Sequence, residues 1–261
     1  MSGAVPSSFR KRLQRGETVL GSFVNLGSSL TAEIMAIAGF DWVVLDLEHG
    51  AGDDAIVVSQ LQALGRTGTA GIVRVESLEL PRFMHALDAG ADGVLVPRLR
   101  GAADARAAVE NARYAHRRGL AKSNRSWHWG LGTRTLDEVD AEVVVAAQIE
   151  TASALAEVDE IAAIDGVDVL FVGPTDLAHS LELHCPPDDP RLLERVAPVA
   201  EAAKRHGKTA GVMTATAQQL APYAELGFRF LGGGSDGGIL ALAAAATVAD
   251  LRRLAGAGAS A

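Results

Sequence analysis

The regular alternation of short apolar runs with stretches of helical spacing constrains the fold of this chain more than any other feature. The apolar runs are continuous and rich in Val, Ile, Leu and Phe, which is typical of parallel strands buried on both faces. We expect strands at residues 19–24, 41–46, 70–75, 93–96, 143–149, 167–172, 209–213 and 228–231. The pattern therefore predicts an α/β protein built on a parallel sheet.

Helical spacing fills the intervals between these runs. Apolar residues recur three and four positions apart in residues 32–38, 53–64 and 80–89, and glycines stand where helices are expected to end. Pro198 falls inside the helical stretch 192–206 and predicts a kink or a split helix there.

Eight strand–helix units in about 250 residues favour a TIM barrel over an open doubly wound sheet, although the alternation by itself does not separate the two folds. No linker rich in Pro, Gly or Ser divides the chain, so we expect a single barrel domain over residues 1–261. The irregular region 117–140 carries Trp127, His128 and Trp129 and is predicted to be a long loop after the fourth unit.

Composition excludes several classes of protein. The formal net charge is −8 at pH 7, whereas a protein that binds nucleic acid is usually basic. No apolar run reaches the roughly 18 residues of a transmembrane helix, and the N-terminus lacks the apolar core of a secretion signal. We therefore expect a cytoplasmic protein with no nucleic-acid or membrane partner. Cys185 is the only cysteine, which excludes an internal disulfide, a CxxC redox pair and a Cys-rich zinc site.

Polar and charged residues gather where the predicted strands end. In a TIM barrel the active site lies at the carboxyl ends of the strands. Those positions hold Asp46, Glu48, His49, Arg74, Arg98, Gln148, Glu150, Gly173, Pro174, Thr175, Asp176 and the glycine-rich residues 232–237. The positions where the strands begin hold no comparable cluster, so we expect the active site at the carboxyl rim.

Glu150 and Asp176 are expected to face each other from adjacent strand ends, with Asp46 and Glu48 nearby. Carboxylates that lie this close raise one another's pKa unless a cation offsets their charge. Ligands that are all oxygen favour Mg²⁺ or Mn²⁺ over zinc. Either acid taken alone could instead stabilise the first turn of the following helix, but the two together beside Arg74 favour a metal site.

His49 and Arg74 are the candidates for proton transfer and for binding an anion. His49 has Asp46 three positions earlier, and a histidine oriented by a carboxylate is a natural general base, whereas a histidine without such a partner is more often structural. A guanidinium at the end of an apolar strand is costly unless it binds an oxyanion, so Arg74 contacts substrate or forms a buried ion pair. Of the other histidines, His128 and His179 are the ones that could reach the rim.

Two further motifs are weaker. Residues 232–237 match G-x-G-x-x-G, but no further strand with an acidic residue follows, which excludes a dinucleotide fold and leaves a phosphate cradle open. Ser28 and Ser29 fit a helix N-cap, since no G-x-S-x-G elbow supports a serine nucleophile.

Six segments of the sequence resemble one known family. They are AEIMAIAGFDWVVLDLEHG, VRVE, LDAGADGVLVPRL, QIETASAL, GVDVLFVGPTDLA and YAELGFRFLGGGSD. Together they resemble the HpcH/HpaI aldolases, which are class II, metal-dependent pyruvate aldolases related to the citrate lyase β-subunit. The resemblance covers roughly residues 16–254, and the blocks D-x-E-H-G, Q-I-E-T and G-P-T-D-L are its most specific parts.

The resemblance implies a TIM barrel that forms hexamers, with the last helix packed on a neighbouring subunit. It implies that Glu150 and Asp176 bind a divalent metal, which is Mg²⁺, Mn²⁺ or Co²⁺. It further implies that Arg74 stabilises the enolate oxygen and that His49 is the base. Asp88 would raise the basicity of His49, and Asp46 would be a second acid beside it. Contacts to the pyruvyl group are implied for Gln148, Gly173, Pro174, Thr175 and Asp176.

We therefore expect a metal-dependent aldolase that reversibly cleaves a 4-hydroxy-2-oxo acid into an aldehyde and pyruvate, or a close 2-oxo acid such as hydroxypyruvate. A Schiff-base mechanism would need a lysine at the rim. None of the chain's lysines is predicted to lie there; they are Lys11, Lys122, Lys204 and Lys208.

Two alternatives stay open at this stage. A citrate-lyase-like enzyme acting on an acyl-CoA ester would need a basic surface for the nucleotide, which only residues 113–125 offer. A non-catalytic metabolite-binding barrel predicts the loss of one of His49, Arg74, Glu150 or Asp176, and all four are present. The sequence departs from the family pattern at Phe23, at Ala51 and at residues 115–117, in loops that we expect to select the aldehyde.

Overall fold

The computed structural model describes residues 8–258, which form a closed barrel of eight parallel strands in sequential order. The strands are β1 (Val19–Val24), β2 (Trp42–Asp46), β3 (Ala70–Arg74), β4 (Gly93–Val96), β5 (Val144–Ile149), β6 (Val169–Val172), β7 (Thr209–Thr214) and β8 (Phe230–Ser235). The prediction of a TIM barrel is confirmed, and the open doubly wound sheet is excluded because β1 pairs with β8.

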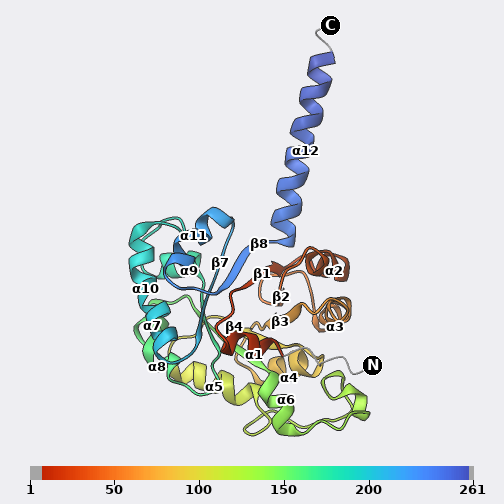
Figure 1. Cartoon of the computed structure of the whole chain (residues 1–261), viewed down its shortest axis with the longest axis vertical. Coiled ribbons are helices and arrows are strands. Elements are labelled where there is room, and N and C mark those ends of the chain that lie inside the picture. The colour runs from red at the N-terminus through yellow and green to blue at the C-terminus, as the bar shows by residue number, and fades with distance from the viewer. Residues whose placement is uncertain (1–7, 259–261) are drawn as a thin grey trace.

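Helices surround the barrel in chain order (Figure 1). They are α1 (Phe9–Gln14), α2 (Ser29–Ile37), α3 (Asp54–Leu64), α4 (Leu80–Asp88), α5 (Ala102–Ala112), η1 (Arg125–Gly130), α6 (Leu136–Glu142), α7 (Ala152–Ala156), α8 (Val158–Ala162), α9 (Pro174–Ser180), α10 (Pro190–Arg205), α11 (Ala217–Glu225) and α12 (Asp236–Gly258). Among the described residues, no helix combines the length and the apolar character that spanning a bilayer requires.

Aromatic side chains fill the inside of the barrel. Trp42 is fully buried and stacks on Phe230 with ring centroids 4.0 Å apart, while Phe171 meets both rings edge-on. Gly232 lies in β8, and a Cβ at this position would come within 2.9 Å of the Trp42 ring. The glycines that the sequence analysis left open as a phosphate cradle therefore belong partly to the strand, where one of them makes room for Trp42.

Two predictions about secondary structure need correction. The helix is not split at Pro198, because α10 continues through this residue, while a kink there stays a prediction. Pro198 lies on the exposed side of α10, so the carbonyl of residue 194 that it leaves without a partner can be hydrated. The region 117–140 is not a loop throughout, since it contains η1 and the start of α6, whose N-terminus carries a capping box of Thr135 and Glu138.

Charged residues also lie at the rim where the strands begin, although the sequence predicted no cluster there. Asp41, Asp92 and Asp168 directly precede β2, β4 and β6, and each accepts a backbone N–H of the preceding strand at 2.9 to 3.0 Å. Arg12 and Arg10 pair with the first and the last of these carboxylates. These aspartates join neighbouring strands, so the charge at this rim is structural.

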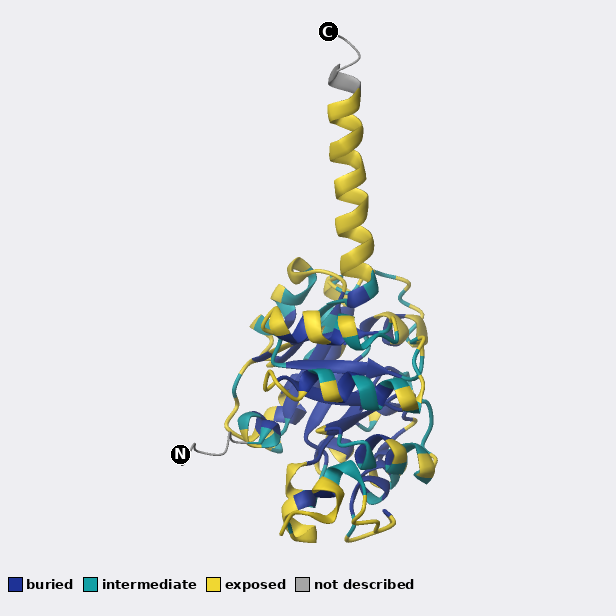
Figure 2. Cartoon of the chain, turned by 90° about the vertical axis from the view of Figure 1, so that its right-hand side faces the viewer, coloured by how far each residue is buried: buried dark blue, intermediate teal, exposed yellow. Residues whose placement is uncertain are grey.

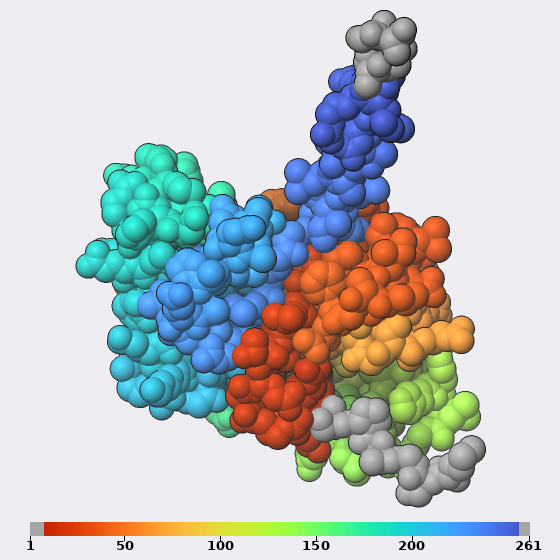
Figure 3. Space-filling view, turned by 45° about the horizontal axis from the view of Figure 1, so that its top comes forward, coloured from red at the N-terminus to blue at the C-terminus, as the bar shows by residue number. Residues whose placement is uncertain are grey.

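Beyond its first turn, the last helix makes little contact with the barrel. α12 projects from the carboxyl end of β8 (Figures 1 and 3), and its side chains are exposed along nearly the whole of its described length (Figure 2). Its exposed apolar residues are Ile239, Leu240, Leu242, Val248, Leu251 and Leu254. A helix of this composition leaves a large apolar surface without a partner in the single chain.

Candidate active site

A cavity of about 570 Å³ opens at the carboxyl ends of the strands. Most of the residues that the sequence placed in the site line it: Asp46, His49, Arg74, Gln148, Gly173, Pro174, Thr175 and Asp176. Glu150 follows β5 and lies directly against this lining, because a Cβ at Gly173 would come within 3.0 Å of its Oε2 atom. Glycine at position 173 lets the turn after β6 approach the Glu150 carboxylate.

Arg74 is a buried, permanently charged group in the wall of this cavity. It ends β3 opposite Asp46, which ends β2 in the adjacent register position. Its Nε and Nη2 atoms donate to the two oxygens of Asp46 at 2.8 and 2.7 Å, and its Nη1 lies 3.2 Å from Oε2 of Glu48. Burial alone would lower the pKa of Arg74, but the Asp46 and Glu48 carboxylates more than offset it and raise the pKa above its ordinary value.

The sequence predicted that Asp46 orients the imidazole of His49, but its carboxylate instead binds Arg74 and the backbone of the following turn. Its Oδ1 atom accepts the backbone N–H groups of Glu48 and His49 at 3.1 and 3.2 Å, so its contact with His49 is through the backbone. Burial would raise the pKa of the Asp46 carboxyl, but the hydrogen bonds and charge of Arg74 outweigh burial, and the pKa lies below its ordinary value. The carboxylate is therefore ionised at neutral pH.

Replacing Asp46 by asparagine should lower the free energy of unfolding by about 3 kcal/mol at pH 7, because it breaks a buried ion pair. Since the folded-state pKa of Asp46 lies below 3.8, its contribution is present above that pH and is lost as the pH falls through the folded-state pKa. Urea unfolding of both proteins at pH 7 and pH 3 measures the difference, which should be smaller at pH 3. The exposed Asp188→Asn is the control, and an equal difference at both pH values would contradict this account.

Glu150 is buried in a site with an excess of negative charge. Its Oε1 accepts the backbone N–H of Arg98, and its Oε2 accepts the side-chain amide of Gln148. Burial raises the pKa of Glu150 above its ordinary value, and the nearby carboxylates of Glu48 and Asp176 add to this rise, whereas the two hydrogen bonds oppose it. A cation at this position would remove the repulsion.

The donor atoms at this position fit a hard divalent cation. Glu150 and Asp176 supply carboxylate oxygens, and Oε1 of Gln148 is buried without a hydrogen-bond partner. Oxygen donors of this kind suit Mg²⁺ or Mn²⁺, which keep several positions for water or substrate. Within residues 8–258, no group of three or more His, Cys, Asp or Glu side chains is arranged to hold a metal, so the protein would supply two carboxylates only.

His49 lines the cavity with an exposed side chain. The imidazole is 71% exposed, and its Nε2 atom lies 3.9 Å from Oε2 of Glu48. Asp88, in contrast, is not brought to His49 within the chain: it ends α4, which returns to the rim where β4 begins, and it accepts a hydrogen bond from Nη2 of Arg118 at 2.7 Å. The carboxylate nearest to the imidazole is therefore that of Glu48.

Sequence reasoning assigned no role to two residues of the rim. Glu48 bridges two arginines, since its Oε1 atom lies 3.0 Å from Nε of Arg98 and its Oε2 atom contacts Arg74. Arg98 has a left-handed backbone with φ of 55°, and its backbone N–H bonds Glu150. The positions of Glu48 and Arg98 after the second and fourth strands indicated that they lie at the rim. Their contacts with Arg74 and Glu150 could not be predicted, because they form only when the barrel closes.

The lysines lie away from the cavity, as predicted. Lys208 precedes β7 and donates to the carbonyl of Ile164, and Lys204 lies in the last turn of α10. Lys11 lies in α1, and Lys122 lies over the Trp127 ring. None of the four lysines lines the catalytic cavity. A Schiff base with the substrate is therefore excluded by geometry.

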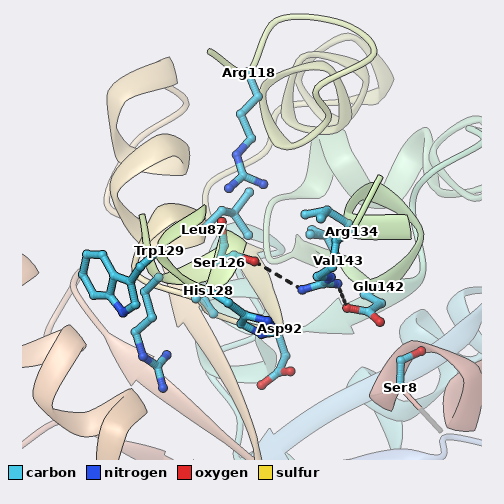
Figure 4. Close-up of a pocket in the computed structure, with 14 residues that line it drawn as sticks. Ser8, Leu87, Asp92, Arg118, Ser126, His128, Trp129, Arg134, Glu142 and Val143 are labelled. Carbon is cyan, nitrogen blue, oxygen red and sulfur yellow. Dashed lines mark hydrogen bonds and ion pairs between the residues drawn. The ribbon is translucent and has the colours of Figure 1, made fainter. Parts of the chain in front are cut away.

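The basic stretch that an acyl-CoA lyase would need lies at the opposite rim. Arg118, Arg125 and Arg134 line a second cavity of about 520 Å³, together with His128 (Figure 4). Each arginine already has acceptors: Asp88 for Arg118, backbone carbonyls for Arg125, and Ser126 and Glu142 for Arg134. This arrangement gives the acyl-CoA alternative no support at the catalytic cavity, and it places His128 at the rim away from the site.

The chain is similar to known proteins over nearly its whole length. Residues 20–243 match the model of the HpcH/HpaI aldolase/citrate lyase family. The chain is 35% identical to a 4-hydroxy-2-oxovalerate aldolase of Rhodococcus jostii (strain RHA1), over 95% of this chain and 97% of that protein. It is 33% identical to a 5-keto-4-deoxy-D-glucarate aldolase of Enterobacter sp. (strain 638), over 90% and 92%. A HpcH/HpaI aldolase/citrate lyase family protein from Burkholderia cenocepacia J2315 superposes with a TM-score of 0.88 at 33% identity, over 93% and 98%.

Proposed function

Because this chain belongs to the HpcH/HpaI aldolase/citrate lyase family, we propose that its site reversibly cleaves a 4-hydroxy-2-oxo acid into an aldehyde and pyruvate, or a close 2-oxo acid such as hydroxypyruvate. The protein is a carbon–carbon lyase of the metal-dependent aldolase type. The observation that carries the proposal is the buried Arg74 cation, held by Asp46 and Glu48 in the wall of a cavity that Asp176 and His49 also line.

Glu150 and Asp176 would hold the divalent cation, and the free oxygen of Gln148 adds a further neutral donor nearby. Mg²⁺ or Mn²⁺ suits these donors best, and Co²⁺ is the third candidate. When bound, the metal supplies Lewis-acid stabilisation of the negative charge that develops on the keto oxygen.

The protein groups divide the remaining work. Arg74 donates to the developing enolate oxygen, where a preorganised cation in a buried site has its largest effect. Gln148 and Thr175 contact the pyruvyl group, and backbone N–H groups in the turn from Gly173 to Asp176 hold its carboxylate, with Pro174 fixing that turn. In the cleavage direction His49 removes the proton of the 4-hydroxyl group, directly or through water, as the C3–C4 bond breaks and its electron pair becomes the enolate. Within the single chain Asp88 pairs with Arg118 and not with His49, so its effect on the basicity of His49 stays a prediction.

Release of pyruvate from 4-hydroxy-2-oxovalerate in the presence of Mg²⁺, Mn²⁺ or Co²⁺, followed with lactate dehydrogenase, tests the function. Borohydride added together with pyruvate should leave every lysine unmodified, because no lysine lines the cavity. A mass increase on Lys11, Lys122, Lys204 or Lys208 that depends on pyruvate would overturn the mechanism, and no pyruvate release with any of the three metals would overturn the function.

We also propose that the protein is a cytoplasmic homohexamer in which α12 packs on a neighbouring copy, and that its other partners are the 2-oxo acid and the aldehyde only. The exposed Leu240, Leu251 and Leu254 of α12 support this proposal, as do Leu30 and Ile34 on the outer face of α2. Both surfaces are apolar, and burying apolar surface is the main driving force of subunit association.

Introducing aspartate at both Leu251 and Leu254 should convert the hexamer into smaller species, because it places charge on the apolar face of α12. Light scattering coupled to size-exclusion chromatography measures the mass. Arg252→Asp is the matched control, since it alters charge on the same turn without removing an apolar side chain. An unchanged mass of the double variant would contradict the proposed role of α12.

A further inference from the structure

The catalytic cavity has a second half that the chemistry of the pyruvyl group does not use. The first half is formed by β2, β3, β5 and β6 and contains all the acidic and basic residues of the lining, which are Asp46, His49, Arg74 and Asp176. The second half is formed mainly by β1, β7, β8 and α12, and its larger side chains are apolar: Phe23, Pro187, Met213, Ile239 and Leu242. Among the described residues, the polar groups of this half are all uncharged: Asn25, Thr214, Gln219 and Ser235.

The apolar half is held in place by specific hydrogen bonds. The buried hydroxyl of Tyr223 donates to the carbonyl of Pro187 at 2.6 Å, which fixes the loop after α9. The Asp236 carboxylate accepts the backbone N–H of Asn25 at 2.9 Å and the hydroxyl of Thr31 at 2.7 Å, which fixes the first turn of α12 against β1. The wall that carries Ile239 is therefore built before any substrate enters.

Within residues 8–258, the arginines in and around the cavity wall already pair with carboxylates. Arg74 is bound by Asp46 and Glu48, and Arg98 is bound by Glu48. Arg191, which follows Pro187 along the chain, pairs with Asp189 at 2.9 Å. A carboxylate on the aldehyde portion of a substrate would thus lose water in the apolar half without gaining a cation, which is strongly unfavourable.

We propose that the aldehyde half of the substrate is uncharged and largely apolar, and that Met213 of β7 with Ile239 and Leu242 of α12 selects it. The inference rests on the proposed aldolase function and narrows its range of substrates. On cleavage C4 of the substrate becomes the aldehyde carbon, and the substrate chain beyond C4 would lie in the apolar half. The names of relatives do not settle this choice: a valerate has an apolar end, whereas a glucarate is a dicarboxylate.

Aldol addition of pyruvate to two aldehydes of similar length tests the inference. Pentanal ends in a methyl group, whereas succinic semialdehyde ends in a carboxylate. With Mg²⁺ and the full-length protein, kcat/KM should be at least about a hundredfold higher for pentanal, because a carboxylate would be left unpaired. An equal or higher kcat/KM for succinic semialdehyde overturns the inference.

A matched pair of variants on α11 locates the effect. Gln219 lines the apolar half and its Oε1 atom has no hydrogen-bond partner, whereas Gln218 is exposed and does not line the cavity. Gln219→Arg should shift the ratio of kcat/KM toward succinic semialdehyde at least about tenfold, because it supplies the missing cation. Gln218→Arg should leave the ratio unchanged. An unchanged ratio in Gln219→Arg, or the same shift in both variants, overturns the assignment of this half to the aldehyde.

Exchange of the methyl protons of pyruvate in D₂O separates this inference from the function on which it rests. The exchange needs the enolate but no aldehyde, and NMR measures it for the wild type and both variants. Exchange without the preference for pentanal overturns the inference and leaves the aldolase function standing. Absence of exchange overturns the proposed function and the inference with it.

Discussion

Replacing Arg74 by alanine should lower kcat for pyruvate release about a thousandfold, while the affinity for Mn²⁺ changes little. The guanidinium is fixed by Asp46 and Glu48 before substrate binds, so in the proposed mechanism it would stabilise the enolate oxygen without reorganising. Loss of one such preorganised donor typically costs a factor of about 10² to 10³ in kcat. Arg74 pairs with Asp46 and Glu48 and not with the proposed metal ligand Glu150, so the affinity for Mn²⁺ should change little when Arg74 is replaced.

Two comparisons keep the Arg74 result interpretable. Arg74→Lys retains one charge but loses the bidentate contact with Asp46, so we expect it to recover only part of the lost kcat. Urea unfolding of both variants shows whether the fold persists, since Asp46 loses its partner in each. A kcat for Arg74→Ala within threefold of the wild type would end the assigned role of Arg74.

Much of the barrel follows from the apolar pattern alone. The strands expected at residues 19–24 and 93–96 have those bounds in the structure, and the others differ mainly at their ends. The short continuous apolar runs differ in length from the longer stretches between them, where apolar residues recur three and four positions apart, which explains this success. The location of the site at the carboxyl rim could also be predicted from the sequence, because all strands of a parallel barrel end on the same side.

The contacts within the site were harder to predict from the sequence. Asp46 is three residues from His49 and 28 residues from Arg74, yet its carboxylate binds the arginine, because the pairing of β2 with β3 places the two side by side. The left-handed backbone of Arg98, which directs its N–H to Glu150, leaves no mark in the sequence, since glycine is the residue that usually adopts it. Such contacts depend on strand register and on single dihedral angles.

Contacts at the rim where the strands begin could not be predicted from the sequence either. Asp92 directly precedes β4 and binds the backbone of β3, which no local pattern indicates. Asp88 was assigned to the site by resemblance, whereas the direction of α4 already carries it to the rim where the strands begin. Residues at helix ends must therefore be placed by the direction of the helix before a motif assigns them to a site.

Glu150→Gln should weaken Mn²⁺ binding by at least about a hundredfold and abolish pyruvate release. Glu150 is one of the two carboxylates that would hold the cation in the proposed site, and removing even an outer partner of a ligand costs about ten- to hundredfold in affinity. The substitution keeps the shape of the side chain and removes its charge in a place where burial already raises its pKa. Titration of the protein with Mn²⁺, followed by the electron paramagnetic resonance of the free ion, measures affinity without reference to activity.

The exposed Glu160→Gln on α8 is the matched control and should bind Mn²⁺ as the wild type does. Treatment of the wild type with EDTA should likewise abolish pyruvate release, and excess Mg²⁺, Mn²⁺ or Co²⁺ should restore it. The first experiment tests where the metal binds, and the second tests whether the reaction needs it. An affinity of Glu150→Gln for Mn²⁺ equal to that of the wild type would place the metal elsewhere in the chain. Full activity of the wild type in EDTA would instead show that the reaction proceeds without a metal, with Arg74 as the principal group stabilising the enolate.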